Sequence, residues 1–138
     1  MKTYLLALLL IGLLIACSSE PVTEADLEGR TFTFANLKEV VIDSPKVKAL
    51  IDEANKATGG MPTPAYQFDK GGKGMAKDFG PFRKMDFPIV WAIKGDTLYT
   101  EMEYTDGPRY NTFHIKKEGD GFVLRRVGET DEYSLKPL

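Results

Sequence analysis

The chain has 138 residues, 18 basic and 20 acidic side chains, a net charge of −2, one cysteine and one histidine. This length suits a single domain, and 43% hydrophobic with 28% charged residues is typical of a globular chain. The basic residues are scattered along the sequence, whereas nucleic-acid binding needs a clustered basic face. Composition therefore favours one globular domain and argues against a nucleic-acid partner.

The N-terminus has the pattern of a targeting segment. Lys2 supplies a positive charge, and residues 4–16 form an uncharged apolar run. This run is shorter than the roughly 20 apolar residues that span a bilayer. The sequence Leu-Ile-Ala-Cys at 14–17 resembles the lipobox of bacterial lipoproteins. An ordinary signal peptide that happens to contain a cysteine is the alternative interpretation.

The lipobox resemblance implies a location and a membrane anchor. The Cys17 thiol would be diacylated first, the signal peptide over residues 1–16 would then be cleaved before Cys17, and the new amino group would receive a further acyl chain such as palmitate. More than one chain is what stable anchoring requires. Ser18 stands where inner-membrane lipoproteins have aspartate, so the resemblance implies the outer membrane without indicating which face.

Residues 17–26 are polar, contain a proline and lack periodicity, which predicts a short tether between lipidated Cys17 and a domain over 27–138. Because Cys17 is the only cysteine, the domain has no disulfide to rely on. Residues 27–35 alternate, with Phe32 and Phe34 on one face, and predict a first strand.

Two helical signals follow the first strand. Asn36 with Glu39 is typical of a capping box and favours a short helix, although the Val-Val-Ile run at 40–42 fits a continued strand equally well. The second signal is clearer, because Ser44 is a good N-cap, Pro45 suits the first helical position and apolar residues recur at 47, 50, 51 and 54. Gly59 and Gly60 predict its end.

From residue 65 onward the pattern predicts strands joined by turns. Tyr66 and Phe68 lie on a strand, residues 69–74 form a glycine-rich turn, and 75–79 return. The hairpin over 88–103 turns at Gly95-Asp96, which pairs Ile89 with Met102 and Trp91 with Thr100. One face of this hairpin is apolar and carries Ile89, Trp91, Ile93, Leu98, Thr100 and Met102.

Later turns extend this face. A turn over 105–108 would pair Tyr104 with Arg109 and Leu98 with Ile115, which places Phe113 on the core side and His114 on the outer face opposite Tyr99. A two-residue turn at 119–120 would place Phe122, Leu124 and Arg126 on the core side, and Tyr133 and Leu135 indicate a last strand. The expected fold is mainly β: an antiparallel up-and-down meander closing into a small barrel, with one amphipathic helix after the first strand.

The aromatic strand and turn at 66–74 and the run Trp-Ala-Ile-Lys-Gly-Asp-Thr-Leu at 91–98 are similar to small lipocalin-like lipoproteins of Gram-negative envelopes. The resemblance implies a calycin-like barrel. The chain departs from lipocalins at its first strand, where Phe32 stands in place of the tryptophan of a Gly-x-Trp motif.

Catalytic and metal-binding patterns are weak. His114 lacks a Gly-x-Ser-x-Gly or comparable nucleophile motif, and Glu101 and Glu103 lie on the wet face of their strand. One histidine and one acylated cysteine do not suffice for a zinc site, and Lys70–Gly74 lacks the Gly-Lys-Ser/Thr order of a phosphate loop. We expect neither enzymatic activity nor a cofactor or metal.

Two functions remain. In the first, the barrel binds a small apolar or amphipathic molecule, and Arg126 meets a carboxylate; alternatively, Arg126 stacks on an aromatic ring, or a slip near 119–121 turns it to solvent. The expected pocket is lined by Trp91, Met102, Tyr104 and Phe113. In the second, a filled core carries a non-catalytic module of the outer membrane, which contacts an envelope protein through Tyr99, Tyr110, Phe82 and Phe87.

Overall fold

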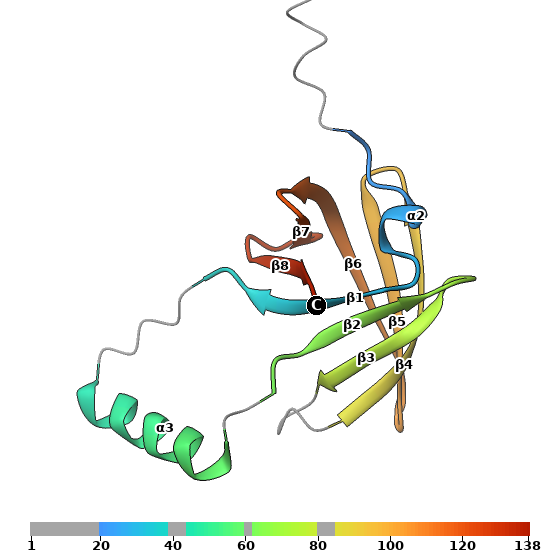
Figure 1. Cartoon of the computed structure of the whole chain (residues 1–138). Helices are drawn as coiled ribbons and strands as arrows, with labels where there is room; N and C mark the ends of the chain where they lie inside the picture. The colour runs from blue at the N-terminus through green and yellow to red at the C-terminus, as the bar shows by residue number, and fades with distance from the viewer. Residues whose placement is uncertain (1–19, 39–43, 60–61, 80–84) are drawn as a thin grey trace, which may run out of the picture.

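Eight antiparallel strands close into an up-and-down barrel in sequence order, which confirms the predicted fold class (Figure 1). The computed structural model describes residues 20–38, 44–59, 62–79 and 85–138. β1 pairs with both β2 and β8, so the sheet leaves no open edge. The strands are β1 (Arg30–Asn36), β2 (Ala65–Asp69), β3 (Lys73–Phe79), β4 (Met85–Lys94), β5 (Thr97–Tyr104), β6 (Gly107–Glu118), β7 (Gly121–Arg126) and β8 (Glu132–Pro137).

Two of the three predicted hairpin registers are confirmed. β4 and β5 turn at Gly95-Asp96 and pair Trp91 with Thr100, and β6 and β7 pair Phe113 with Arg126. Their turn glycines, Gly95 and Gly119, have positive φ, which suits the short loops that join twisted strands.

The register predicted between β5 and β6 is wrong by two residues. The turn contains only Thr105 and Asp106, so Tyr104 lies opposite Gly107 and Leu98 opposite Phe113. Gly107 has φ 122°, a conformation that L residues rarely adopt and that permits the tighter turn. A shift of two preserves the side-chain alternation, so Phe113 still faces the core and His114 still faces outward, opposite Thr97 rather than Tyr99.

The barrel interior is filled by large apolar side chains. Phe32 contacts Phe68 and Phe122 edge-on, with ring centroids 6.0 and 5.5 Å apart, and Phe68 contacts Trp91 at 5.1 Å. The largest fully buried side chains are Tyr66, Phe32, Phe68, Phe113, Leu27, Leu98, Leu124 and Leu135. An eight-stranded barrel is wide enough for such side chains to fill it, and here they form one continuous core.

The end of the barrel that receives the N-terminal segment is covered by α2 (Glu24–Leu27) (Figure 1). Leu27 is fully buried, and Val22 is buried in the same core. Below them, Trp91 Nε1 donates a hydrogen bond of 2.7 Å to Lys73 O. The tether predicted over 17–26 therefore needs correction, because its part from Val22 onward packs against the barrel.

Local polar contacts hold α2 in place. The Thr23 backbone N–H donates to Asp26 Oδ2 at 2.7 Å, and this bond is the main reason that the pKa of Asp26 lies below its usual value. Lys117 Nζ lies 3.2 Å from Asp26 and 3.5 Å from Glu20. These contacts tie the N-terminal segment to β6.

The predicted amphipathic helix is confirmed as α3 (Pro45–Thr58), between β1 and β2. Ser44 Oγ accepts from Val47 N at 3.5 Å, and Gly59 ends the helix in the left-handed conformation. Figure 1 shows α3 standing away from the barrel, and Val47, Leu50 and Ile51 are exposed, Leu50 by 66%. The helix is thus capped at both ends, and its apolar stripe is not packed against the barrel.

Neither described helix is long and apolar enough to cross a membrane. The predicted signal peptide, Cys17, Glu39 and Phe82 all lie outside the described residues. Asn36 belongs to β1, and its Oδ1 accepts from the Lys38 backbone N–H at 2.8 Å.

Candidate functional site

Three of the predicted ligand-binding residues lie deep in the barrel. Trp91, Met102 and Phe113 all point inward and are buried in the hydrophobic core. Tyr104 and Arg126 lie at the strand ends farthest from α2. Phe113 connects the two groups, because it lies opposite Arg126 on the neighbouring strand and its ring contacts the guanidinium.

This second end carries a cluster of aromatic rings, which we call the mouth: Phe34, Phe79, Phe87, Tyr104 and Tyr133, with Arg126. Phe34 stacks on Tyr133 with ring centroids 4.8 Å apart, and Phe87 stacks on Tyr104 at 4.2 Å. All except Phe87 are only partly buried, so one layer of rings stays accessible above the packed core.

Arg126 lies on the inner face, as the predicted register requires. Its guanidinium carbon is 5.7 Å from the centre of the Phe113 ring and 5.8 Å from that of Tyr133. These contacts confirm the alternative interpretation of Arg126, in which it stacks on aromatic rings. Nη1 reaches Glu129 Oε1 at 3.4 Å, whereas Nε is buried without a hydrogen-bond partner among the described residues. Arg126 thus retains an unused donor beside an apolar wall.

Tyr66 lies directly below the mouth, packed against Phe34 and Phe79 with centroids 5.3 and 5.0 Å away. Burial raises the pKa of its hydroxyl well above the usual value, while the positive charge of Arg126 acts in the opposite direction. The phenol is therefore neutral at physiological pH, and Arg126 supplies the positive charge of the mouth.

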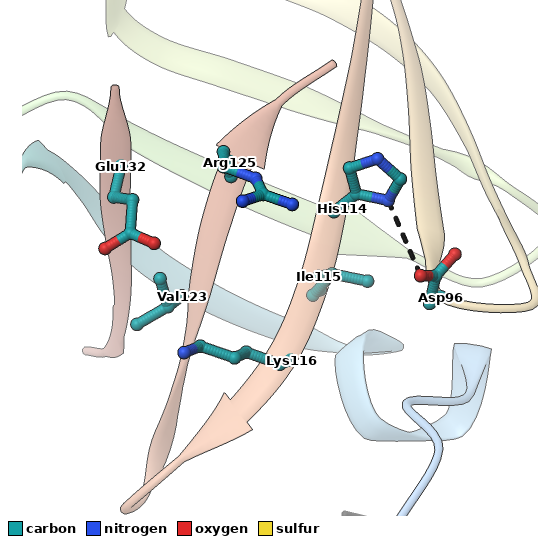
Figure 2. A pocket seen from close by; sticks show the side chains of 7 residues that line it. All are labelled: Asp96, His114, Ile115, Lys116, Val123, Arg125 and Glu132. Atoms are coloured by element: carbon teal, nitrogen blue, oxygen red, sulfur yellow. Dashed lines mark ion pairs between the residues drawn. The ribbon is translucent and has the colours of Figure 1, made fainter. Parts of the chain in front are cut away.

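A separate pocket of about 360 Å³ lies on the outer face of β6, β7 and β8 (Figure 2). We call it the outer pocket; it is lined by Asp96, His114, Ile115, Lys116, Val123, Arg125 and Glu132. His114 Nδ1 lies 3.5 Å from Asp96 Oδ2. Lys116 and Arg125 form no ion pair within the part of the chain that the structure describes.

The outer face of β4, β5 and β6 is more apolar. Val90, Tyr99 and Tyr110 are exposed there, Tyr110 by 71%, and they line a depression of about 180 Å³. Glu101 borders the same depression and so lies on the outer face, as predicted. Phe87 was predicted to be exposed beside this surface, which is wrong: only 5% of it is exposed, because it stacks on Tyr104 inside the barrel.

Sequence reasoning missed Phe34, Phe79 and Tyr133 at the mouth and Lys116 and Arg125 at the outer pocket. The alternation of side chains along β1 and β8 assigns Phe34 and Tyr133 to the inner face. Their positions near strand ends are the additional sequence signal that could have placed them at an end of the barrel. Side-chain alternation places Lys116 and Arg125 on the outer face of their strands. Only the pairing of β6 with β7 brings them to the same pocket.

Comparison with known proteins adds no relative. No family model matches the chain, and neither the curated proteins nor the solved structures contain a match.

Proposed function

We propose that this protein is a lipid-anchored envelope protein of the calycin-like type that binds a small amphipathic anion at the mouth of its barrel. The observation that carries the proposal is Arg126, whose buried Nε has no hydrogen-bond partner in the described part of the chain and whose guanidinium lies over two aromatic rings. A buried donor without an acceptor is unfavourable, and the rest of the guanidinium stays reachable, because 37% of the Arg126 side chain is exposed and its Nη groups could bind an incoming anion.

The surrounding rings support a ligand that also has an apolar part. Phe34, Phe79 and Tyr133 are partly buried and face the same end as Arg126. An apolar wall with one convergent polar group is the usual composition of a small-molecule site. Glu129, at 3.4 Å from Arg126, is a weak internal partner that a ligand carboxylate or sulfonate would displace.

The neighbouring arginine offers a matched control for this proposal. Arg125 and Arg126 are adjacent on β7, yet Arg126 faces the mouth and Arg125 lines the outer pocket. We expect the amphipathic anion 8-anilinonaphthalene-1-sulfonate to bind the full chain, with affinity about tenfold weaker in Arg126→Gln and unchanged in Arg125→Gln. Fluorescence titration measures both, and equal weakening by the two variants would rule out the mouth as the site.

The anchor has its own test. Cys17→Ser removes the thiol that the lipobox acylates, so the expressed protein should no longer enter the detergent phase on phase separation, whereas Ser18→Ala should still enter it. Cell fractionation of the wild type should place it with the outer membrane. Recovery of Cys17→Ser in the detergent phase would show that a feature other than acylated Cys17 attaches the protein to the membrane.

A second function is favoured by a different observation. The barrel interior is filled by its own side chains, while Val90, Tyr99 and Tyr110 form an exposed apolar patch on the outer sheet face. Such a patch suits contact with an envelope protein. Tyr110→Ser should then abolish cross-linking to that partner in intact cells and leave anion binding at the mouth unchanged; unaltered cross-linking would eliminate this patch.

A further inference from the structure

The outer pocket contains two cationic side chains, Lys116 and Arg125, together with His114 and two carboxylates, Asp96 and Glu132. Lys116 and Arg125 form no ion pair with these carboxylates or with any other among the described residues. Lys and Arg side chains that lack an ion-pair partner and share a pocket are suited to binding phosphate. Lys acts as a point charge, and Arg donates paired hydrogen bonds from its planar guanidinium.

Figure 2 shows how these groups are directed. The guanidinium of Arg125 turns toward His114 and away from the Glu132 carboxylate, and Lys116 extends across β7 beside Val123. Val123 is buried and forms an apolar floor between them. A pocket of about 360 Å³ lies within the size range of small-ligand sites, which begins near 300 Å³.

The position of the pocket indicates where its anion comes from. Lys116 is followed by Lys117, which pairs with Glu20 and Asp26 of the N-terminal segment. Cys17 precedes Glu20 by three residues, which reach at most about 10 Å. An acylated Cys17 would therefore hold this end of β6 close to the headgroup layer of the bilayer.

From the charges, the shape and the position together, we infer that the outer pocket binds the phosphate group of an anionic phospholipid in the membrane that carries the anchor. This inference rests on the proposed lipid anchor, but not on binding at the mouth. Its effect is to orient the barrel: the anchor fixes one point on the membrane, and the headgroup fixes a second.

The experiment uses His114, which is the only histidine of the chain and lines the pocket. The mature acylated protein is placed in nanodiscs of phosphatidylcholine, and phosphatidylglycerol is added in steps while the imidazole resonances of His114 are recorded by NMR. We expect a saturable shift in the wild type and in the control Arg126→Gln. The shift should be lost in the double variant Lys116→Gln/Arg125→Gln.

Each other outcome overturns the inference in a distinct way. The absence of a shift in the wild type would exclude a headgroup at this pocket. An equal shift in the double variant would show that the resonance responds to the negative surface potential of the bilayer and not to a headgroup bound in the pocket. A shift of the same size with inorganic phosphate and discs of phosphatidylcholine alone would identify free phosphate as the ligand. Detergent-phase partition of the same preparation verifies the anchor, so that a failed anchor and a failed pocket are distinguished.

Discussion

The two ends of the barrel are built in opposite ways. At the α2 end, Leu27 is fully buried and Trp91 Nε1 is hydrogen-bonded to Lys73 O. At the mouth, aromatic rings remain partly accessible, and Arg126 Nε is buried with no hydrogen-bond partner among the residues that the structure describes. The α2 end thus satisfies the packing and hydrogen-bonding rules of a stable core, whereas Arg126 at the mouth departs from them. Because such departures concentrate where proteins bind ligands, we expect the α2 end to determine stability and propose the mouth as the binding site.

The largest effect is expected for Leu27→Ala. Removing a fully buried leucine leaves a cavity beneath α2, and the free energy of unfolding should fall by about 2–5 kcal/mol. Leu37→Ala is the matched control, because Leu37 is exposed and should change stability by less than about 0.5 kcal/mol. Urea unfolding followed by Trp91 fluorescence measures both. Similar values for the two variants would contradict a packed α2 end.

The next largest loss of stability is expected at Gly74, near the same end, where the backbones of β2 and β3 approach closely. A Cβ on Gly74 would lie 2.0 Å from Gln67 O, so Gly74→Ala must separate β2 from β3 and should lower stability by about 1–3 kcal/mol. Gly119→Asn is the control, because its turn is open and asparagine tolerates positive φ. Thermal unfolding compares them, and a fully stable Gly74→Ala would disprove the close strand approach.

Just below the mouth, Tyr66 predicts a pH dependence. Because burial raises the pKa of its hydroxyl in the folded state, the unfolded chain loses this proton first as pH rises. The stability contribution of Tyr66 is complete below its ordinary pKa of 10.0 and declines as pH rises above that value. Urea unfolding between pH 8 and 11 should show this decline (an alkaline range set by a tyrosine pKa of about 10). Tyr66→Phe should flatten it, and an unchanged slope would exclude Tyr66 as its source.

The smallest effect on the barrel is expected for Ser44→Ala. Loss of the N-cap should lower the stability of α3 by about 1 kcal/mol, which reduces helical signal in circular dichroism. Since the stripe of α3 does not pack against the barrel, the thermal transition of the barrel should not move. A lower barrel transition would mean that α3 supports the mouth in solution.

The fold was predictable wherever short-range signals determined it. Gly95-Asp96 and Gly119-Asp120 fixed two registers, and Ser44, Pro45 and Gly59 fixed α3. The turn at Thr105 was not predictable, because the proline at 108 favoured a longer loop and the tight turn depends on Gly107. α2 was missed because four residues are too few for a periodic pattern.

The candidate sites were predictable only in part. Alternation placed Arg126 on the inner face, since the β6–β7 turn fixed its parity. The ring cluster was not predictable, because Phe34 and Tyr133 meet only when β8 pairs with β1 and closes the barrel. The outer pocket likewise requires three strands to be paired in one register. The amphipathic pattern of α3 predicted a helix but could not specify its partner.

Native mass spectrometry of the wild type, Arg126→Gln and Arg125→Gln, each purified after exposure to envelope lipid extract from which phospholipids have been removed, is the most direct test of anion binding at the mouth. We expect a discrete added mass on the wild type that is absent from Arg126→Gln and present on Arg125→Gln. A ligand-free mass for all three proteins across every extract would contradict binding at the mouth, and would leave the barrel as a filled scaffold that acts through its outer surface.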